Sequence, residues 1–148
     1  MTTATTKDLT TQLVEQWNEL GAKTGALGEA MTGKTFDAVP VDGVRSPAEV
    51  FRHLTFWNRW VAAKVRGEEP DGSANEIGRS EAPNREKALA AFAASVADAA
   101  AAFTGRGRNG IDADAAALCA SFLGHTAEHY GQLAVYARMA GIVPPASR

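Results

Sequence analysis

Hydrophobic residues recur at helical spacing in four stretches of the chain, and no stretch sustains the alternation of a half-buried strand over five or more residues. We expect the four helices to run from about Lys7 to Ala30, Ser46 to Arg66, Asn84 to Phe103 and Asp112 to Ala140. This pattern predicts an all-α fold in which four helices pack as a bundle.

The second predicted helix has the clearest ends. Ser46-Pro47-Ala48-Glu49 is a capping box with proline at the first helical position, and Gly67 suits the position just after the last turn. In the first helix, by contrast, Gly21, Gly25 and Gly28 weaken the second half. We therefore expect that helix to fray or to end early.

Two long connections separate the predicted helices. Residues 31–45 contain turn signals and several apolar side chains, so we expect a connection that packs across the bundle. Residues 67–83 are rich in Gly, Pro, Asp, Glu and Ser, and a loop of this length either serves a function, such as a pocket lid, or has none. Thr104-Gly105-Arg106-Gly107 and Gly110 are turn signals before the last helix.

Size and composition favour one soluble globular domain over residues 1–148. The mass is 15.5 kDa, with 45% hydrophobic and 22% charged residues, which excludes a disordered chain. No apolar run approaches the roughly 18 residues of a membrane span, and MTTATTKDLTTQ has neither the basic nor the apolar region of a secretory signal.

Charge and cysteine content indicate which partners and which compartment to expect. The net charge of -2 and the isoelectric point near 5.9 argue against binding to nucleic acid or to acidic membranes. Cys119 is the one cysteine, so an internal disulfide is impossible and a reducing, cytoplasmic setting is expected.

The three histidines of the chain all fall on apolar, core-facing stripes. His125 and His129 are one turn apart on the last predicted helix, and His53 lies at the centre of the stripe of the second. Either each is a core histidine with its own polar partner, or the three share a cation that accepts a lone pair from each neutral imidazole. Their joint placement favours the shared cation.

Three histidine ligands leave the fourth position of a zinc ion open for water or substrate. Cys119 lies about 120° around the helix from His125, so it is expected to be a small buried residue at a helix contact and not a fourth ligand. Zinc is the expected metal, and nickel and ferrous iron also accept three imidazoles.

Several neighbouring side chains carry two interpretations. Gln132, on the same arc as His129, positions substrate as a catalytic residue, holds the second nitrogen of a ligand, or is only a polar residue at the edge of the bundle. Glu49 either orients His53 or serves only in the capping box, and Glu128 is either a general base or a solvated residue. Three aromatic residues either line a pocket or belong to the core: Trp57, Trp60 and Tyr136.

Motifs of other enzyme classes are missing from the sequence. It contains no H-E-x-x-H, Gly-rich phosphate loop, G-x-S-x-G or C-x-x-C. Zincin proteases, phosphate-loop enzymes, serine hydrolases and thioredoxin-like proteins therefore have no support.

Two stretches of the chain resemble a known family. GHTAEHYGQLAVYARMAGIVPP, residues 124–145, resembles the closing helix of the DinB-like superfamily of small metal-binding helical proteins, which are distinct from the DNA polymerase of the same name. SPAEVFRHLTFWNRW, residues 46–60, resembles the second helix of that family. The order and length of the helices match over nearly the whole chain.

The resemblance implies an up-down-down-up four-helix bundle, commonly dimeric, with a divalent metal held by His53, His125 and His129. Similar proteins include S-transferases that use bacillithiol or mycothiol and a mycothiol-dependent maleylpyruvate isomerase. The related domain of ergothioneine-synthesising enzymes carries H-x3-H-x-E for iron, but Gly131 stands at the glutamate position here, so that activity is not expected.

The sequence thus leaves three functions open. One is a metal-dependent transferase that uses a low-molecular-weight thiol on a small electrophile. The others are hydrolysis by a metal-activated water and a non-catalytic metal-dependent binding or stress protein. We expect a homodimer whose interface includes bundle helices and excludes the loop 67–83.

Overall fold

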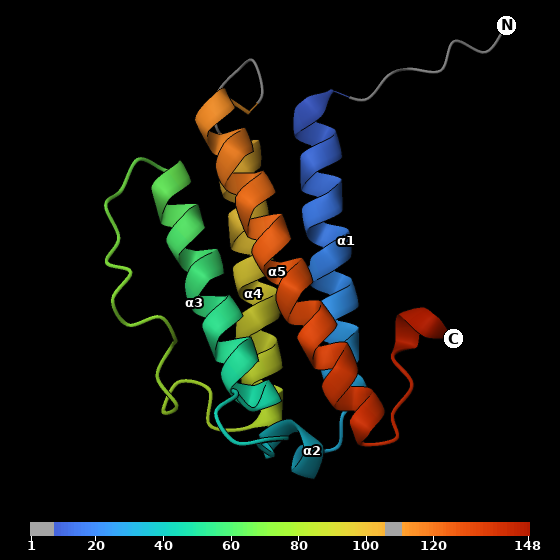
Figure 1. Cartoon of the computed structure of the whole chain (residues 1–148). Coiled ribbons are helices and arrows are strands. Elements are labelled where there is room, and N and C mark those ends of the chain that lie inside the picture. Colours follow the sequence, from blue (N-terminus) through green and yellow to red (C-terminus); the bar gives the residue numbers. More distant parts are fainter. Residues whose placement is uncertain (1–7, 106–110) are drawn as a thin grey trace, which may run out of the picture.

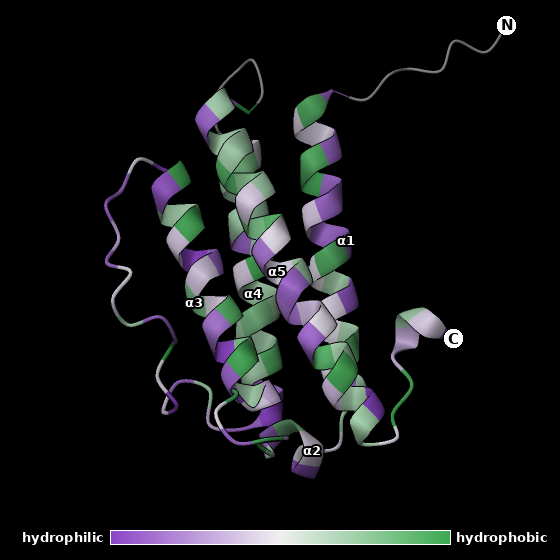
Figure 2. Cartoon of the chain, in the orientation of Figure 1, coloured by the Kyte–Doolittle hydropathy of each residue, from purple (hydrophilic) through white to green (hydrophobic). Residues whose placement is uncertain are grey.

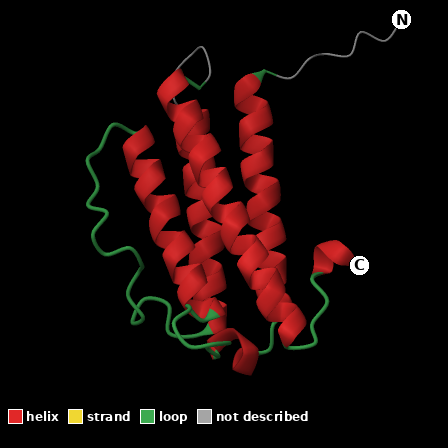
Figure 3. Cartoon of the chain, viewed as in Figure 1, coloured by secondary structure: helices red, strands yellow, loops and turns green. Residues whose placement is uncertain are grey.

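The computed structural model describes residues 8–105 and 111–148. These residues form five α-helices and a short 3-10 helix, and none of them forms a strand, which confirms the all-α class (Figures 1 and 3). The helices are α1 (Leu9–Ala30), α2 (Gly33–Asp37), α3 (Pro47–Val65), α4 (Arg85–Thr104) and α5 (Ala113–Met139), followed by η1 (Pro145–Ser147).

Four long helices lie side by side, and α2 lies at one end of them (Figure 1). In this view α1 and α5 run downward while α3 and α4 run upward, so the loop 67–83 must return along the full length of the bundle. Helix α4 packs against α3 and α1, and α5 packs against α1 and α3. The histidines of α3 and α5 therefore lie on neighbouring helices.

Helix α1 is continuous to Ala30, so the expected early end was wrong. Two of its glycines make close helix packing possible. A Cβ at Gly21 would lie 2.5 Å from Val96 Cγ1, and a Cβ at Gly28 would lie 2.5 Å from Leu89 Cδ2. Tertiary packing thus outweighs the low helix propensity of glycine at these positions.

The connection 31–45 contains the short helix α2, which the sequence pattern did not predict. Thr32 caps it by accepting a hydrogen bond from the backbone N–H of Thr35. Phe36 is fully buried and stacks on Phe51 of α3 with ring centroids 5.4 Å apart. The expected packing of this connection is confirmed for Phe36 and for the partly buried Val44, whereas Val39 and Val41 are exposed.

The capping box of α3 is confirmed. Ser46 Oγ accepts from Glu49 N at 3.2 Å, and the Glu49 carboxylate accepts from Ser46 N at 2.7 Å. The expected start of the last helix at Asp112 is likewise confirmed, because Asp112 is its N-cap and its side chain accepts from Ala115 N. The turn signals at Arg106, Gly107 and Gly110 lie outside the described residues, as does the expectation for residues 1–7.

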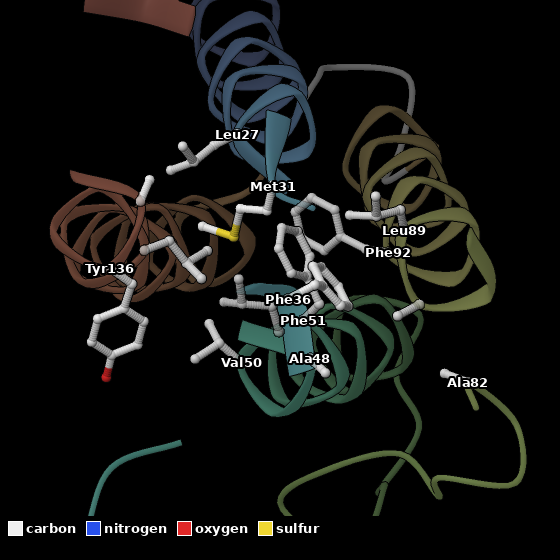
Figure 4. Packing of buried hydrophobic residues seen from close by; sticks show 14 of the residues in the cluster. Leu27, Met31, Phe36, Ala48, Val50, Phe51, Ala82, Leu89, Phe92 and Tyr136 are labelled. Carbon is white, nitrogen blue, oxygen red and sulfur yellow. The ribbon is translucent and has the colours of Figure 1, made fainter. Parts of the chain in front are cut away.

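The buried apolar residues form two clusters along the bundle. The first contains Phe51 and Phe92, whose rings meet edge to face at 5.2 Å, and it lies at the α2 end (Figure 4). The second, at the opposite end, contains Trp17 and Phe103, which also meet edge to face at 5.2 Å. Neither cluster includes a histidine.

The sequence pattern predicted that no segment is long and apolar enough to span a membrane. Helix α4 is an exception. By those two measures Arg85–Thr104 is long and apolar enough, with a mean hydropathy of 1.3. Much of α4 falls in the hydrophobic colours of Figure 2, and its hydropathy comes largely from alanine. Its largest apolar side chains, Leu89, Phe92 and Phe103, are buried in the bundle, as in the core helix of a soluble protein.

Candidate metal centre

The three histidines meet between α3 and α5. His53 lies near the middle of α3, and His125 and His129 lie one turn apart on α5. The Nε2 atoms of His53 and His125 are 3.0 Å apart, and one ring nitrogen from each of the three residues lies within 4.8 Å of the others. Residues 72 positions apart in the chain are thereby brought into one cluster, as the shared stripes predicted.

Two of the rings are held by carbonyl oxygens that can only accept a hydrogen bond. His53 Nδ1 lies 2.7 Å from the backbone oxygen of Asn75, and His129 Nδ1 lies 2.8 Å from Gln132 Oε1. Each Nδ1 must therefore carry a proton, which leaves the Nε2 lone pair of a neutral ring free. That lone pair is the one a metal ion would use.

The third ring, His125, is less constrained. His125 Nε2 faces His53 Nε2, which offers a lone pair. Without a cation, His125 Nε2 therefore carries a proton and donates a hydrogen bond to His53 Nε2. None of the described residues bonds to its Nδ1. The proton can therefore move to Nδ1 and free Nε2 for a metal ion.

Burial favours the neutral form of His53 and His125. It lowers the pKa of His53, which is 6% exposed, and the hydrogen bond to Asn75 only partly opposes this effect. Burial also lowers the pKa of His125 to about 4, with smaller contributions in the same direction from His129, His53 and Arg45. Both rings are therefore neutral at pH 7, the form that binds metal.

The donor set fits a divalent cation. Two nitrogens bound to one tetrahedral zinc ion lie about 3.3 Å apart, which is close to the separation of His53 and His125. The set contains nitrogen donors alone, and three ligands would leave one position open. Such a set suits zinc, nickel or ferrous iron better than magnesium or calcium, which prefer oxygen ligands.

The comparisons with known proteins agree with this geometry. The family model described as the DinB superfamily matches residues 12–133, which include all three histidines. The chain belongs to the DinB superfamily. No curated protein and no solved structure matched it. The family assignment confirms the resemblance to the DinB superfamily, and the match covers residues 46–60 and the part of 124–145 up to residue 133.

In this member of the DinB superfamily, an aromatic cluster borders the histidines. The ring centroids of Phe122 and His125 are 5.7 Å apart, those of Trp57 and His125 are 6.4 Å apart, and Trp57 and Trp60 both contact Phe122 at 5.9 Å. All three aromatic residues are partly exposed. The aromatic residues thus extend one side of the metal centre toward solvent.

Both the oxygen and the nitrogen of the Gln132 side-chain amide form hydrogen bonds. Its oxygen accepts from His129, and its Nε2 donates to the hydroxyl oxygen of Tyr136 at 2.6 Å. This geometry matches the second of its two sequence interpretations, in which it holds the other nitrogen of a ligand. Tyr136 also lines a pocket of about 270 Å³ between α2 and α5, which contains none of the three histidines.

The other residues named from the sequence lie outside the cluster. Glu49 is bonded within the capping box, and Glu128 is exposed. Cys119 is fully buried in the second apolar cluster, and burial raises the pKa of its thiol to about 11. A thiol in that state is not a metal ligand at neutral pH.

Sequence reasoning missed two residues beside the metal centre. Asn75 sits in the loop 67–83, 22 positions from the ring it contacts, and no periodicity connects the two. Arg45 lies close enough for its positive charge to lower the pKa values of His53 and His125. The Ser46 cap, which places the start of α3 next to Arg45, was the one local signal available.

Proposed function

We propose that this protein is a metal-dependent transferase that uses a low-molecular-weight thiol on a small electrophilic substrate. The observation that carries the proposal is the convergence of three imidazoles within 4.8 Å, because three ligands are one fewer than a tetrahedral ion takes. A divalent cation held there would supply the positive charge that keeps a thiol ionised at neutral pH. We also infer the up-down-down-up bundle of the family and a cytoplasmic setting.

The residues around the cluster suit this chemistry. The guanidinium of Arg45 is 37% exposed and pairs with Glu76 at 3.7 Å, and its positive charge acts on the histidines. A thiol carboxylate could share this guanidinium with Glu76. The partly exposed rings of Trp57 and Phe122 would contact an apolar portion of the electrophile. The sulfur would form a new bond to the electrophilic carbon as the leaving group departs with its electron pair.

Hydrolysis at the same centre is less well supported. It would call for a general base near the open position, yet Glu49 is bonded within the capping box and Glu128 is exposed. Neither carboxylate belongs to the cluster. We propose that Gln132 orients His129. It would influence the position of the substrate only through that ligand.

The deciding experiment measures thiolate formation. Elemental analysis of the purified protein identifies the metal, and ultraviolet absorbance then follows the addition of bacillithiol, mycothiol or glutathione to metal-saturated protein. We expect a thiolate signal at neutral pH with at least one thiol, and none with the His125→Ala variant. The exposed neighbour Glu128→Gln serves as the matched control. Absence of a thiolate signal with all three thiols would exclude the transferase and leave hydrolysis or a non-catalytic role.

A further inference from the structure

The loop 67–83 is attached along α3. Trp60 Nε1 donates to the backbone oxygen of Pro70 at 3.0 Å, and Ile77 N donates to the backbone oxygen of Arg52 at 3.3 Å. Salt bridges add to these contacts, including Arg52 to Glu76 and Arg59 to Glu81. The loop therefore has a defined path over the helix that carries His53.

Asn75 is the point where this loop touches the metal centre. It is the only non-glycine residue of the described chain with a positive φ, at 59°. Its backbone oxygen accepts from His53 Nδ1 at 2.7 Å, and its side-chain oxygen accepts from Trp57 Nε1 at 2.8 Å. Because an indole nitrogen can only donate, the amide of Asn75 is oriented with its oxygen toward Trp57.

The residue type suits this conformation. Asparagine is among the few residues other than glycine that adopt the left-handed region routinely. With that backbone turn, the carbonyl of Asn75 points at the histidine while its side chain binds the next aromatic residue on the same face of α3. Two contacts from one residue thus hold His53 and Trp57 in fixed relative positions.

We propose that Asn75 is a positioning residue of the metal centre, which fixes both the orientation and the tautomer of His53. The inference rests on the proposed metal site. A hydrogen bond to the second nitrogen of a ligand histidine orients the ring and strengthens it as a donor. The loop 67–83 accordingly acts as a strap over the metal centre and not as a loop without a role.

The first test uses metal-free protein and long-range ¹H–¹⁵N NMR of the histidine rings. In the wild type we expect His53 to carry its proton on Nδ1. Asn75→Ala removes the side-chain acceptor and disfavours the left-handed turn, so we expect a mixture of tautomers. Asn75→Asp keeps the acceptor and tolerates the turn, so it should restore the Nδ1–H form. An unchanged tautomer in Asn75→Ala would overturn the proposal.

The second test measures Co²⁺ affinity and the visible spectrum of the bound ion. We expect Asn75→Ala to weaken binding about 10–100-fold and to alter the spectrum, with Asn75→Asp close to wild type. Trp57→Phe, which removes only the indole donor, should weaken binding less. Glu69→Ala breaks the salt bridge from Glu69 of the loop to Lys64 of α3, and it should leave Co²⁺ binding unchanged.

The outcomes separate the two proposals. If His53→Ala, His125→Ala and wild type all bind Co²⁺ equally, the metal site itself is wrong. If the histidine variants lose the ion while Asn75→Ala binds it as wild type does, or while Asn75→Ala and Asn75→Asp are equally weak, only the role of Asn75 is wrong. Thermal unfolding of each variant shows whether weak binding reflects loss of the fold.

Discussion

The histidine cluster ties the stability of the metal-free protein to pH. The folded state keeps the pKa of His125 at about 4 and lowers that of His53, whereas both rise to about 6.5 on unfolding. Below pH 6.5 the unfolded chain therefore binds protons that the folded chain does not. The contribution of the two histidines to the free energy of unfolding is therefore fully present above pH 6.5. It is lost as the pH falls toward 4.

We expect the free energy of unfolding of the metal-free protein to fall by about 2 kcal/mol between pH 7 and pH 4.5, allowing for partial solvent screening at His125. Urea unfolding in the presence of a chelator measures this. The groups that face His125 are His53, His129 and Arg45. His125→Gln should remove most of the pH dependence, and an equally steep dependence in that variant would contradict the assignment.

Gly28 permits close packing of α1 on its neighbours. An added Cβ would lie 2.5 Å from Leu89 Cδ2 and 2.7 Å from Phe51 Cζ, and an aromatic ring cannot give way cheaply. We expect Gly28→Ala to destabilise the protein by about 1–3 kcal/mol, despite the higher helix propensity of alanine. Gly124, an exposed position of α5, has no atom within 4 Å of the position that a Cβ would take, so Gly124→Ala should stabilise by up to about 1 kcal/mol. Equal effects in thermal unfolding would disprove this packing role.

At the scale of elements, the sequence predicts those helix ends that depend on residues within one turn of each other. The capping box at Ser46 located the start of α3 because its hydrogen bonds lie within one turn. The predicted end of the first helix at Ala30 was correct, but the fraying or early end expected from its glycines was wrong. Glycine propensity is local, whereas the packing of Gly21 and Gly28 involves α3 and α4. Helix α2 was missed because it has only five residues, too few for a periodic pattern.

The same distinction applies to the candidate metal centre. Helical periodicity placed His53, His125 and His129 on facing stripes, and the structure brings them together. The hydrogen bond from His129 to Gln132 was foreseeable because three residues along a helix share a face. The contact of Asn75 was not foreseeable, because it depends on the path of an irregular loop.

The capping box should contribute measurably to the helix that carries His53. Ser46 is 4% exposed, and its hydroxyl satisfies the backbone N–H of Glu49. We expect Ser46→Ala to lower the free energy of unfolding by about 1 kcal/mol. Thr32→Ala, at the cap of the much shorter α2, should cost less. Denaturant unfolding compares the two variants, and no loss in Ser46→Ala would show that the cap is dispensable.

At the scale of the whole molecule, we expect the fold to be independent of the metal. Two clusters of buried apolar side chains lie along the bundle, and their burial stabilises it whether or not an ion is bound. We expect His129→Ala to lose the metal and any metal-dependent activity while keeping its helical circular dichroism. A disordered spectrum for this variant, with a folded Glu128→Gln control, would show instead that the metal is needed for folding.

The surface of α1 and α4 is the best candidate for contact with a second copy. Between these helices runs a groove of about 370 Å³ lined mainly by small residues, among them Ala22, Gly25, Ala26, Ala93 and Ala97. Small side chains let the helices of two molecules approach closely. The apolar character of α4, only part of which is buried in one chain, points to the same face.

We therefore propose a homodimer that packs through α1 and α4 and leaves the loop 67–83 uncovered. Light scattering at micromolar concentration should give twice the chain mass of 15.5 kDa. Ala97→Glu places a charge in the groove, where an unpaired carboxylate is costly to bury, so this variant should be monomeric. Ala74→Glu places the same charge on the loop, at an exposed position, and should remain dimeric. A wild-type mass of one chain would rule out the dimer. A monomeric Ala74→Glu variant would show that the interface includes the loop, which contradicts the expectation from the sequence.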